Sequence, residues 1–301
     1  MSSKFVSEKV IDGNKIAREI REEVSASVEE MMNKHSMKPG LAVILVGEDP
    51  ASAVYVRNKE RSAIEVGMKS KTFRLSSFIT EEEVVALIRD LNENDEYHGI
   101  LVQLPLPEHI NENRVIENIS FMKDVDGLHP VNAGLLAAGN PRFVPATPAG
   151  IKELLIRTDN NPSGKHVVVL GRSNIVGRPV SNLLSMKDDG GNATVTVCHS
   201  RSSHLKDFTK TADILVAALG IPNYIGAEMV SEGAVIIDVG INRVDAPDRK
   251  RGYRLVGDVN FEEVLPKSSA ITPVPGGVGP LTIAMLLSNT VQAARLFNHG
   301  A

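Results

Sequence analysis

The feature of this sequence that most restricts its fold is a series of short, continuously apolar runs separated by helical segments. Leu41–Val46 is one such run, and Gly99–Gln103 is another that stays apolar up to its last residue. A strand is apolar over its whole length when both of its faces are covered, as in a parallel sheet flanked by helices. Pro105 and Pro107 end the second run, because proline cannot donate to a sheet. The first half is therefore predicted to contain βαβ units.

The helices between these runs carry their own start signals. Apolar residues recur at every fourth position over residues 16–28, an Asp–Pro pair stands at 49–50, and a Thr-to-Glu capping box spans 80–83. These signals predict helices over residues 16–34, 50–66 and 80–91.

The second half repeats the alternation after a turn-rich stretch, residues 158–165. Thr147-Pro148 forms another N-cap and first-residue pair, which predicts a helix over 147–157. The charged segment Asp245–Arg254 is predicted to be an exposed loop, and residues 281–296 are predicted to be helical. Four strands are predicted, at His166–Leu170, Ala193–Cys198, Ile214–Ala218 and Val235–Val239.

Composition excludes several classes of function. With 301 residues, 42% of them hydrophobic, the chain can bury the cores of two domains. A net charge of −4 argues against general nucleic-acid or membrane binding, although a local basic pocket stays open. The single cysteine, Cys198, excludes an internal disulfide. Since the chain shows neither a secretory signal nor an apolar run of about 20 residues, a cytoplasmic location is expected, but a processed organellar protein would look the same.

A strand, a glycine-containing turn and a helix start follow one another at Val167–Gly177, the context in which a dinucleotide-binding motif has meaning. Gly171 and Gly177 allow a tight turn and a close approach of phosphate to a helix N-terminus. Ser173 stands where the usual motif has its second glycine, and one extra residue precedes Gly177. An ordinary strand-turn-helix corner is the alternative interpretation.

The end of the next strand bears on the choice between NAD and NADP. NAD-preferring folds usually place a carboxylate there for the ribose 2′-hydroxyl, but this strand ends with Cys198-His-Ser-Arg201. Arg172, Ser200 and Arg201 could instead surround a 2′-phosphate, which favours NADP. The alternative is that Arg201 is only a solvated loop charge.

Two further turns follow the third and fourth strands of this half. Gly220 follows the third strand, and Gly240 and Ile241 follow the fourth. Open parallel sheets bind ligands beyond the carboxyl ends of their strands, so both turns are predicted to face the cofactor. The alternative is that the glycines only form tight turns.

Ser52, Tyr55 and Lys59 share one face of the predicted 50–66 helix, because they lie at positions i, i+3 and i+7. Such a face is often merely solvated. Three features favour a functional site instead: Gln103 at the end of an apolar strand, the carboxylates of Asp124-Val-Asp126, and the stiff loop Thr272–Pro280 before a helix. A rigid linker between domains is the alternative for that loop.

Six motifs occur in order: Tyr55-Val-Arg-Asn-Lys59, Gly99–Pro107, Lys123-Asp-Val-Asp-Gly127, Gly171-Arg-Ser173, Asp238-Val-Gly-Ile-Asn242 and Pro273–Pro280. Together they resemble the methylenetetrahydrofolate dehydrogenase/cyclohydrolase family, from about Ile11 to Leu296. The resemblance implies an α/β fold of two βαβ domains with a cleft between them, the second a Rossmann-like dinucleotide-binding parallel sheet. The implied domains are a folate-binding catalytic domain, residues 1–147, joined by the C-terminal helix 281–301, and an NADP-binding domain, residues 148–280.

The resemblance also implies an activity. Family members oxidise 5,10-methylenetetrahydrofolate to the methenyl form with a nicotinamide cofactor and hydrolyse that product to 10-formyltetrahydrofolate, in one-carbon metabolism and purine biosynthesis. Lys59 is implied to act in the hydrolysis with Gln103 as its partner, Tyr55 to stack on the folate, and Asp126 to pair with the pterin edge. The implied substrate-binding set contains these four catalytic residues and also Ser52, Val102, Leu104, Pro275, Gly276, Gly277, Val278 and Gly279.

The cofactor implied by the resemblance is NADP. The implied cofactor-binding residues are Gly171, Arg172, Ser173, Gly177, Ser200, Arg201, Gly220, Gly240 and Ile241. In some relatives an arginine near the position of Arg201 holds phosphate with magnesium for NAD use, so NAD stays an alternative. The expected partners are tetrahydrofolate substrates and a second copy of the chain, in a homodimer through the nucleotide-binding domain, with no nucleic acid, membrane or metal.

Three other functions stay open. A catalytically silent dinucleotide-binding module would explain the Gly171 turn but not Lys59 or the Pro273–Pro280 loop. A dehydrogenase acting on shikimate or an amino acid would share the two-domain plan but lack the Gln103 and Asp126 pair. A monofunctional dehydrogenase of the same family would still carry Lys59.

The remaining candidate side chains are expected to be structural. His98, His129 and His199 lack metal-ligand spacing and are expected to be structural or surface residues. Cys198 ends an apolar strand and is expected to be a small buried hydrophobe rather than a nucleophile.

Overall fold

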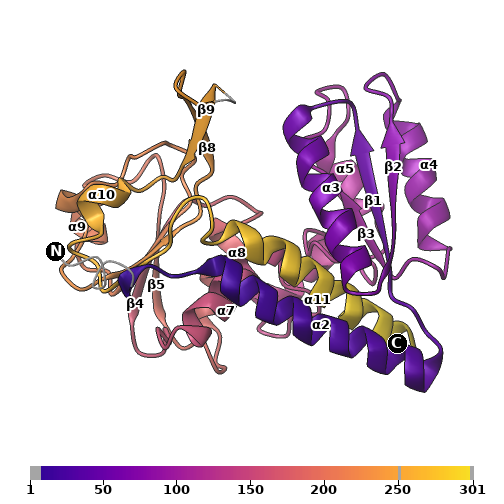
Figure 1. Cartoon of the computed structure of the whole chain (residues 1–301), viewed down its shortest axis with the longest axis horizontal. Helices are drawn as coiled ribbons and strands as arrows, with labels where there is room; N and C mark the ends of the chain where they lie inside the picture. Colours follow the sequence, from indigo (N-terminus) through magenta and orange to yellow (C-terminus); the bar gives the residue numbers. More distant parts are fainter. Residues whose placement is uncertain (1–7, 250–251, 299–301) are drawn as a thin grey trace. The chain divides into compact units, whose positions relative to one another are not determined.

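The computed structural model describes residues 8–249 and 252–298, and its backbone contacts divide the chain into two compact units (Figure 1). One unit consists of Arg18–Ala146 with the described residues from Ile283 onward, and the other consists of Thr147–Thr282 with the described residues up to Ala17. We call them the 18–146 unit and the 147–282 unit. The divisions fall inside three helices, α2 (Gly13–His35), α7 (Ala146–Arg157) and α11 (Gly279–Asn298).

The 18–146 unit is built around a three-stranded parallel sheet in the order β2-β1-β3. Its elements are β1 (Gly40–Val46), α3 (Pro50–Glu65), β2 (Lys69–Leu75), α4 (Glu81–Asn92), β3 (Gly99–Val102), α5 (Glu112–Glu117) and α6 (Pro130–Ala137). β1 and β3 are buried at every position, which confirms the prediction of strands covered on both faces. Ile44 of β1 pairs with Phe73 of β2 and with Val102 of β3, so Gln103 follows directly at the carboxyl edge of the sheet.

The helix-start signals of this unit are confirmed. The Asp49 side chain accepts the backbone N–H of Ser52 at 2.7 Å, and α3 begins at Pro50. Thr80 and Glu83 form the reciprocal capping box that opens α4.

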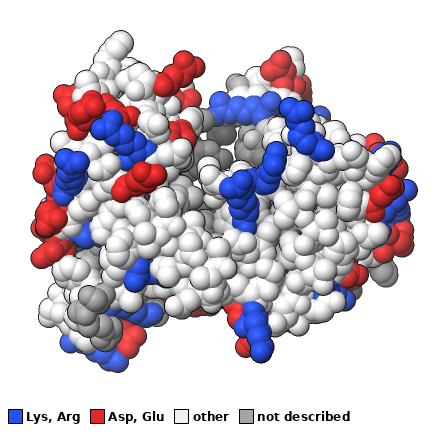
Figure 2. Space-filling model, turned by 180° about the vertical axis from the view of Figure 1, so that it is seen from behind, with Lys and Arg blue, Asp and Glu red and all other residues white. Residues whose placement is uncertain are grey.

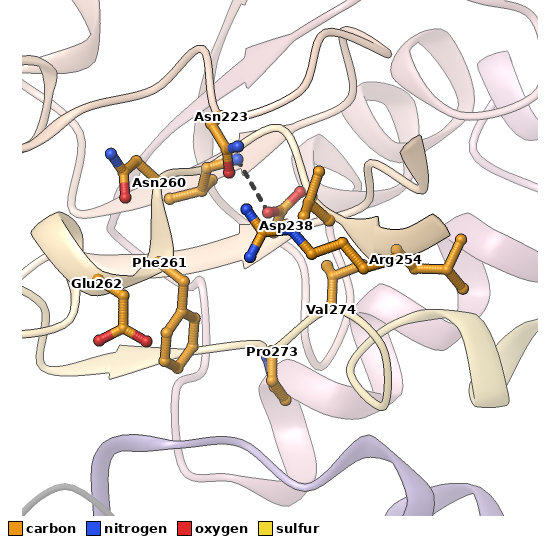
Figure 3. A pocket seen from close by; sticks show the side chains of 12 residues that line it. Asn223, Asp238, Arg254, Asn260, Phe261, Glu262, Pro273 and Val274 are labelled. Atoms are coloured by element: carbon orange, nitrogen blue, oxygen red, sulfur yellow. Dashed lines mark hydrogen bonds between the residues drawn. The ribbon is translucent and has the colours of Figure 1, made fainter. Parts of the chain in front are cut away.

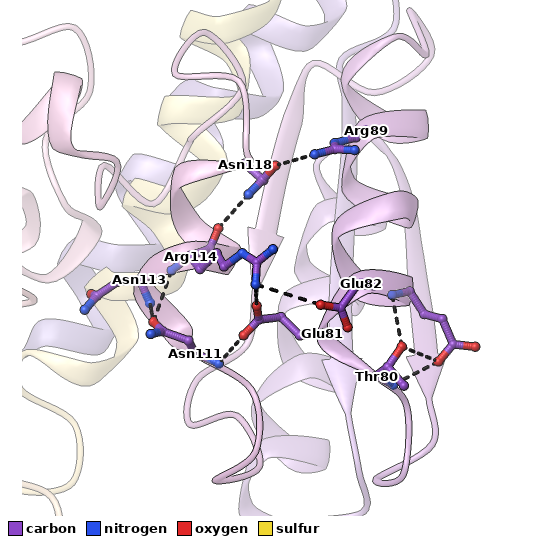
Figure 4. Close-up of polar contacts among 9 residues, drawn as sticks. Thr80, Glu81, Glu82, Arg89, Asn111, Asn113, Arg114 and Asn118 are labelled. Carbon is purple, nitrogen blue, oxygen red and sulfur yellow. Dashed lines mark hydrogen bonds and ion pairs between the residues drawn. The ribbon is translucent and has the colours of Figure 1, made fainter.

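Polar contacts tie α5 to the start of α4 (Figure 4). Arg114 Nη1 lies 2.5 Å from Glu81 Oε1, and Glu81 also accepts the backbone N–H of Asn111 at 2.7 Å. Glu112, the first residue of α5, accepts the backbone N–H of Leu106 at 3.1 Å. These contacts fix the segment that follows β3, at the edge where the predicted catalytic side chains lie.

The 147–282 unit contains a five-stranded parallel sheet in the order β10-β7-β6-β4-β5 and a two-stranded antiparallel pair, β8-β9. Its elements are α7 (Ala146–Arg157), β4 (His166–Leu170), α8 (Gly177–Ser185), β5 (Thr194–Cys198), α9 (Leu205–Thr209), β6 (Ile214–Ala217), η1 (Ala227–Met229), β7 (Val235–Asp238), β8 (Asn242–Asp245), β9 (Tyr253–Val256), α10 (Phe261–Val264) and β10 (Ala270–Ile271). The four predicted strands are confirmed to within one residue at each end. The strand order reverses at β4, as in open sheets that bind ligands at the point of reversal.

The register of this sheet aligns the carboxyl ends of its strands. Leu170 pairs with Cys198 and with Ala217, and Ala217 pairs with Asp238. The residues that follow the four strands therefore lie along one edge: Gly171, His199, Ala218 and Val239.

The predicted exposed loop at Asp245–Arg254 is wrong at both of its ends. Asp245 pairs with Tyr253, and Val244 pairs with Arg254, in the antiparallel β8-β9 pair. Half-buried and exposed residues alternate along β8, so the charges that suggested a loop occupy the solvent face of a hairpin.

Two further details differ from the sequence prediction. β2 is not predicted, because it is an edge strand with lysines at positions 69 and 71 and is at most half-buried, so no continuous apolar run marks it. Helix α7 begins at Ala146, so Thr147 lies within its first turn instead of capping it, and its hydroxyl lies 3.0 Å from that of Thr282.

The segment before α2 belongs by its contacts to the 147–282 unit. Val10 forms a parallel bridge with Ile271 of β10, and the Ile11 N–H donates to the Ile271 carbonyl at 2.9 Å. The extended chain therefore continues the sheet beyond β10. Across residues 8–249 and 252–298, no helix has the length and apolar character needed to cross a membrane.

Candidate active site

Lys59 of α3 and Gln103 after β3 meet side chain to side chain. Lys59 Nζ donates to Gln103 Oε1 at 3.0 Å. The Gln103 backbone N–H donates to the carbonyl of Ile44, which ties the residue to the sheet, and its Nε2 donates to the Leu104 carbonyl at 2.7 Å. This second bond leaves Oε1 facing the lysine. The predicted pair is therefore present, with its amide orientation set by the backbone.

Charge and burial act in opposite directions on this lysine. Burial lowers the pKa of Lys59, and the carboxylate of Asp126 acts to raise it again. Burial also raises the pKa of Asp126, against the lowering effect of Lys59. A desolvated lysine beside a carboxylate can exchange a proton nearer to neutral pH than a solvated one.

The loop that carries Asp126 is held from within. Asp124 is buried and accepts the backbone N–H groups of Leu128 at 3.2 Å and His129 at 2.8 Å, together with the Asn132 side chain at 2.8 Å. Burial raises the pKa of Asp124, and its hydrogen bonds act to lower it. Asp124 therefore organises the turn, and Asp126 is the carboxylate left to act on Lys59.

The Asp126 loop is also held from outside. The Ile100 N–H donates to the Lys123 carbonyl at 2.8 Å, which joins the loop to β3. Asn289 of α11 donates to the carbonyls of Val125 and Val144 at 2.8 and 2.9 Å. The position of Asp126 is thus fixed by β3 on one side and by α11 on the other.

The other predicted substrate residues of this unit differ in exposure. Ser52 and Val102 are buried, Leu104 is half-buried, and Tyr55 is 42% exposed. A merely solvated helix face fits Tyr55 but not Ser52, nor Lys59 with its Gln103 contact. Tyr55 offers an open aromatic face on the same helix as the lysine.

The predicted cofactor turn in the 147–282 unit requires both of its glycines. Gly171 has a φ of 119°, and a Cβ there would collide with the Ala218 carbonyl. A Cβ on Gly177 would collide with the backbone of Gly171. Ser173 Oγ accepts the N–H groups of Val176 at 3.1 Å and Gly177 at 3.4 Å. The serine that stands in place of the motif's second glycine therefore adds a side-chain acceptor at the start of α8.

The three residues predicted to bind the 2′-phosphate follow two neighbouring strands. Arg172 follows β4, and Ser200 and Arg201 follow β5, with β4 and β5 paired in register. All three side chains are exposed. The structure therefore brings their backbone positions to the same end of adjacent strands.

Two buried carboxylates in this unit are not predicted as functional residues from the sequence, although Asp238 begins one of the six motifs. Asp238, the last residue of β7, and Asp258, after β9, accept backbone N–H groups around the predicted cofactor turns. Burial raises the pKa of Asp238 to about 6, its backbone hydrogen bonds oppose this, and the charge of Asp258 adds to it. An aspartate ending an apolar strand, and a Gly-Asp pair after another, are the signals that could have identified them.

A pocket of about 530 Å³ lies in the same unit and has Asp238 in its wall (Figure 3). Its labelled lining includes Asn223, Arg254, Phe261 and Pro273. None of the predicted cofactor or substrate residues lines it.

The stiff loop before α11 is closely packed. Gly276 has a φ of 103°, and Gly277 lies against Thr272, Pro273 and Gly13, where a Cβ would not fit. Pro275–Gly279 belongs to the 147–282 unit, whereas Lys59 and its neighbours belong to the 18–146 unit. Their joining into one substrate site stays a prediction.

The three histidines and the cysteine have structural surroundings. The Nδ1 atoms of His98, His129 and His199 accept the backbone N–H groups of Gly40, Val131 and Arg201, respectively. Cys198 is buried, and burial raises the pKa of its thiol, so it is a small core residue as predicted. In the part of the chain that the structure describes, no three His, Cys, Asp or Glu side chains are placed to hold a metal ion.

Surface charges are mixed in sign. On the face shown in Figure 2, several Lys and Arg side chains lie close together in the upper middle, and most Asp and Glu side chains lie toward the edges. The presence of both signs agrees with the small net charge of −4.

Two family models match the chain. The catalytic domain of tetrahydrofolate dehydrogenase/cyclohydrolase matches residues 11–126, and the NAD(P)-binding domain of the same enzymes matches residues 145–298. The chain belongs to the tetrahydrofolate dehydrogenase/cyclohydrolase family. The catalytic match contains Lys59, Gln103 and Asp126, and the NAD(P)-binding match contains the Gly171 turn.

Relatives in this family are similar over nearly their whole length. The bifunctional protein FolD of Prosthecochloris aestuarii is 54% identical, with 94% of this chain and 97% of that protein covered. The crystal structure of FolD from Campylobacter jejuni is 46% identical, with a TM-score of 0.89 over 95% of this chain and 98% of that one. The Trypanosoma brucei enzyme, solved with NADP and an inhibitor, is 39% identical, with a TM-score of 0.91 over 96% of this chain and 98% of that one.

Proposed function

We propose that this chain oxidises 5,10-methylenetetrahydrofolate to 5,10-methenyltetrahydrofolate with NADP and hydrolyses the product to 10-formyltetrahydrofolate in one shared active site. The observation that carries the proposal is the Lys59–Gln103 pair beside Asp126, in a segment that matches the family's catalytic domain. Family membership over both domains supports the two reactions.

In the hydrolysis, water adds to the methenyl carbon and one carbon–nitrogen bond of the bridge breaks. Lys59 is proposed to take a proton from the attacking water and to return it to the departing nitrogen, while the second proton of that water is released to solvent as the formyl C=O forms from the cationic methenyl group. Its lowered pKa suits this exchange, because a solvated ammonium would hold its proton at neutral pH. Gln103 is proposed to aim the amine by accepting its hydrogen bond.

Asp126 is proposed to accept two parallel N–H bonds from the amino-pyrimidine edge of the pterin. Tyr55 is proposed to stack on the folate ring, since its ring is partly exposed on the same helix as Lys59. Ser52, Val102, Leu104 and the loop Pro275–Gly279 complete the proposed substrate wall.

NADP supplies the hydride acceptor for the oxidation. The turn after β4 suits a dinucleotide, because the absence of a Cβ at Gly171 and Gly177 lets the backbone of the turn pack closely against the N-terminus of α8. Arg172, Ser200 and Arg201 are proposed to hold the 2′-phosphate. The relative from Trypanosoma brucei, solved with NADP, supports the choice of NADP over NAD.

Turnover of the purified chain tests the proposal. With methylenetetrahydrofolate and NADP, absorbance should show the methenyl product and then 10-formyltetrahydrofolate. The same assay with NAD, with and without magnesium and phosphate, should be slower throughout. A preference for NAD, or oxidation without subsequent hydrolysis, would contradict the corresponding half of the proposal.

Three further assignments accompany this function. We propose a homodimer formed through the 147–282 unit, a cytoplasmic location, and a supply of formyl groups to purine biosynthesis. They are supported by family membership alone. Sedimentation of the purified chain at micromolar concentration tests the first, and a monomer would overturn it.

A further inference from the structure

A buried carboxylate gathers the backbone of the turn after β6. Asp258 is fully buried. Its Oδ2 accepts the N–H groups of Leu219 at 2.6 Å and Gly220 at 2.9 Å, and its Oδ1 accepts that of Ile221 at 3.0 Å. One side chain thus holds three consecutive amides, those of the turn that contains the proposed cofactor residue Gly220.

The same carboxylate reaches the turn after β7. Asn242 Nδ2 donates to Asp258 Oδ1 at 2.9 Å, and Asn242 directly follows Ile241. Gly240 packs so closely on the carboxyl group that a Cβ there would collide with it. Asp258 therefore links the Gly220 turn to the Gly240–Ile241 turn.

A second carboxylate anchors the first. Asp238 accepts the N–H groups of Asp258 and Val259, both at 2.9 Å, and that of Gly240 at 3.0 Å. A side chain at Gly257 would collide with Asp238. The contacts therefore run without interruption from the end of β7 through both carboxylates to the turn after β6.

The chemistry of this arrangement calls for charged acceptors. Asp258 receives four donors, which matches the lone-pair capacity of a carboxylate and exceeds that of an amide. Within residues 8–249 and 252–298, neither carboxylate forms an ion pair with a lysine, arginine or histidine. Burying such groups is expensive, and hydrogen bonds to them are short and directional. Asp238 and Asp258 therefore fix the backbone geometry at a desolvation cost that apolar side chains would not have.

We infer that Asp258 is a positioning residue for NADP, which sets the turns after β6 and β7 relative to each other, with Asp238 as its anchor. The inference rests on the proposed function and assigns Asp258 no contact with the cofactor. It acts through the Leu219–Ile221 amides and through Asn242.

The test is Asp258→Asn, measured by NADP titration calorimetry on the full chain. Asparagine keeps the shape but presents a donor in place of one oxygen, so two of the four hydrogen bonds are lost in either orientation. The NADP Kd should rise about tenfold or more, because each lost bond is to a charged acceptor. Hydrolysis of added methenyltetrahydrofolate without NADP should stay within about twofold, because the lysine site lies outside these contacts.

Two control variants separate positioning from general stability. Val264→Ala opens a cavity in the core of the same unit, at a residue of α10 that belongs to neither turn, and should lower Tm while leaving the NADP Kd within about twofold. Asp213→Asn makes the same chemical change at the opposite edge of the sheet, where Asp213 accepts the His166 N–H at 2.8 Å, and should leave the Kd unchanged. If Val264→Ala with an equal loss of Tm weakened NADP equally, the inference would be overturned.

A milder variant covers the case in which Asp258→Asn does not fold. Asn242→Ala removes only the side-chain link to Asp258, and should raise the NADP Kd about threefold with Tm nearly unchanged. Unchanged affinity in every folded variant overturns the positioning role while the proposed function stands. A wild-type chain that binds no NADP overturns the proposed cofactor and this inference together.

Discussion

Lys59 and Gln103 of the 18–146 unit meet side chain to side chain, whereas Gly220 and Gly240, two of the predicted cofactor residues of the 147–282 unit, donate their backbone amides to Asp258 and Asp238. The first arrangement sets the proton affinity of one group. The second sets where backbone donors lie. The difference teaches that chemistry and binding are carried by separable parts, so substitutions in one unit should leave the other function largely intact.

The largest expected effect is on hydrolysis. Lys59→Met should lower cyclohydrolase turnover about a thousandfold, since it removes the proposed acid–base group, and should lower dehydrogenase turnover by about tenfold at most. Absorbance assays of each half-reaction measure both rates. Arg61→Met, which removes an exposed cation on the same helix, serves as the control and should change neither. Equal loss of both activities in a folded Lys59 variant would show that the two units do not carry separable functions.

The next effect is on stability. The pKa of Asp238 is raised from 3.8 to about 6 in the folded chain, so the folded state binds more protons than the unfolded state between these values. Unfolding free energy should therefore fall as pH rises through this window, by about 3 kcal/mol in total and by about 2 kcal/mol between pH 4.5 and 7.

The comparison for this stability effect is Asp238→Asn, which cannot titrate. Urea unfolding at several pH values should show that the variant lacks the Asp238 component of the slope, whatever its absolute stability. Parallel pH profiles for the variant and the wild type would show that the buried carboxylate is not titrating in this range.

A smaller effect is expected on cofactor choice. Arg201→Ala should raise KM for NADP about tenfold and leave KM for NAD unchanged, because only NADP carries the 2′-phosphate. Lys187→Ala, which removes another exposed cation of the same unit, is the matched control. If KM rises for both cofactors alike, Arg201 acts on the shared part of the dinucleotide.

The smallest effect separates folding from function within the 18–146 unit. Thr80→Ala removes the capping box of α4 and should lower the unfolding free energy by about 1 kcal/mol. Both activities should stay at wild-type levels below the melting transition. A loss of hydrolysis out of proportion to stability would mean that α4 helps to shape the lysine site.

The sequence predicts those strands whose burial makes their residues continuously apolar. β1 is buried along its whole length, and β4 is buried and apolar from Val167 to Leu170, so both strands are predicted. β2 is a half-exposed edge strand with alternating lysines, and such a pattern is also that of a loop. The β8-β9 pair is missed for the same reason, since its charges lie on a solvent face.

The candidate sites follow a parallel rule. Gln103 is predicted because it ends an apolar strand, whereas Lys59 is predicted from the helix face it shares with Ser52 and Tyr55 and from the family resemblance. Asp238 and Asp258 are missed because their partners are backbone amides distant in sequence, and nothing in side-chain pattern records those contacts. Pairing across turns becomes visible only with coordinates.

The hydrogen bonds from Asn289 to the carbonyls of Val125 and Val144 have a consequence for synthesis on the ribosome. The 147–282 unit is complete once Thr282 has been made, but the earlier-made 18–146 unit still lacks the part of α11 that closes it. We expect the nascent chain to carry one finished unit beside an open one until the last helix emerges. The region made first is therefore the last to fold, and truncation within α11 should expose its core to chaperones and proteases.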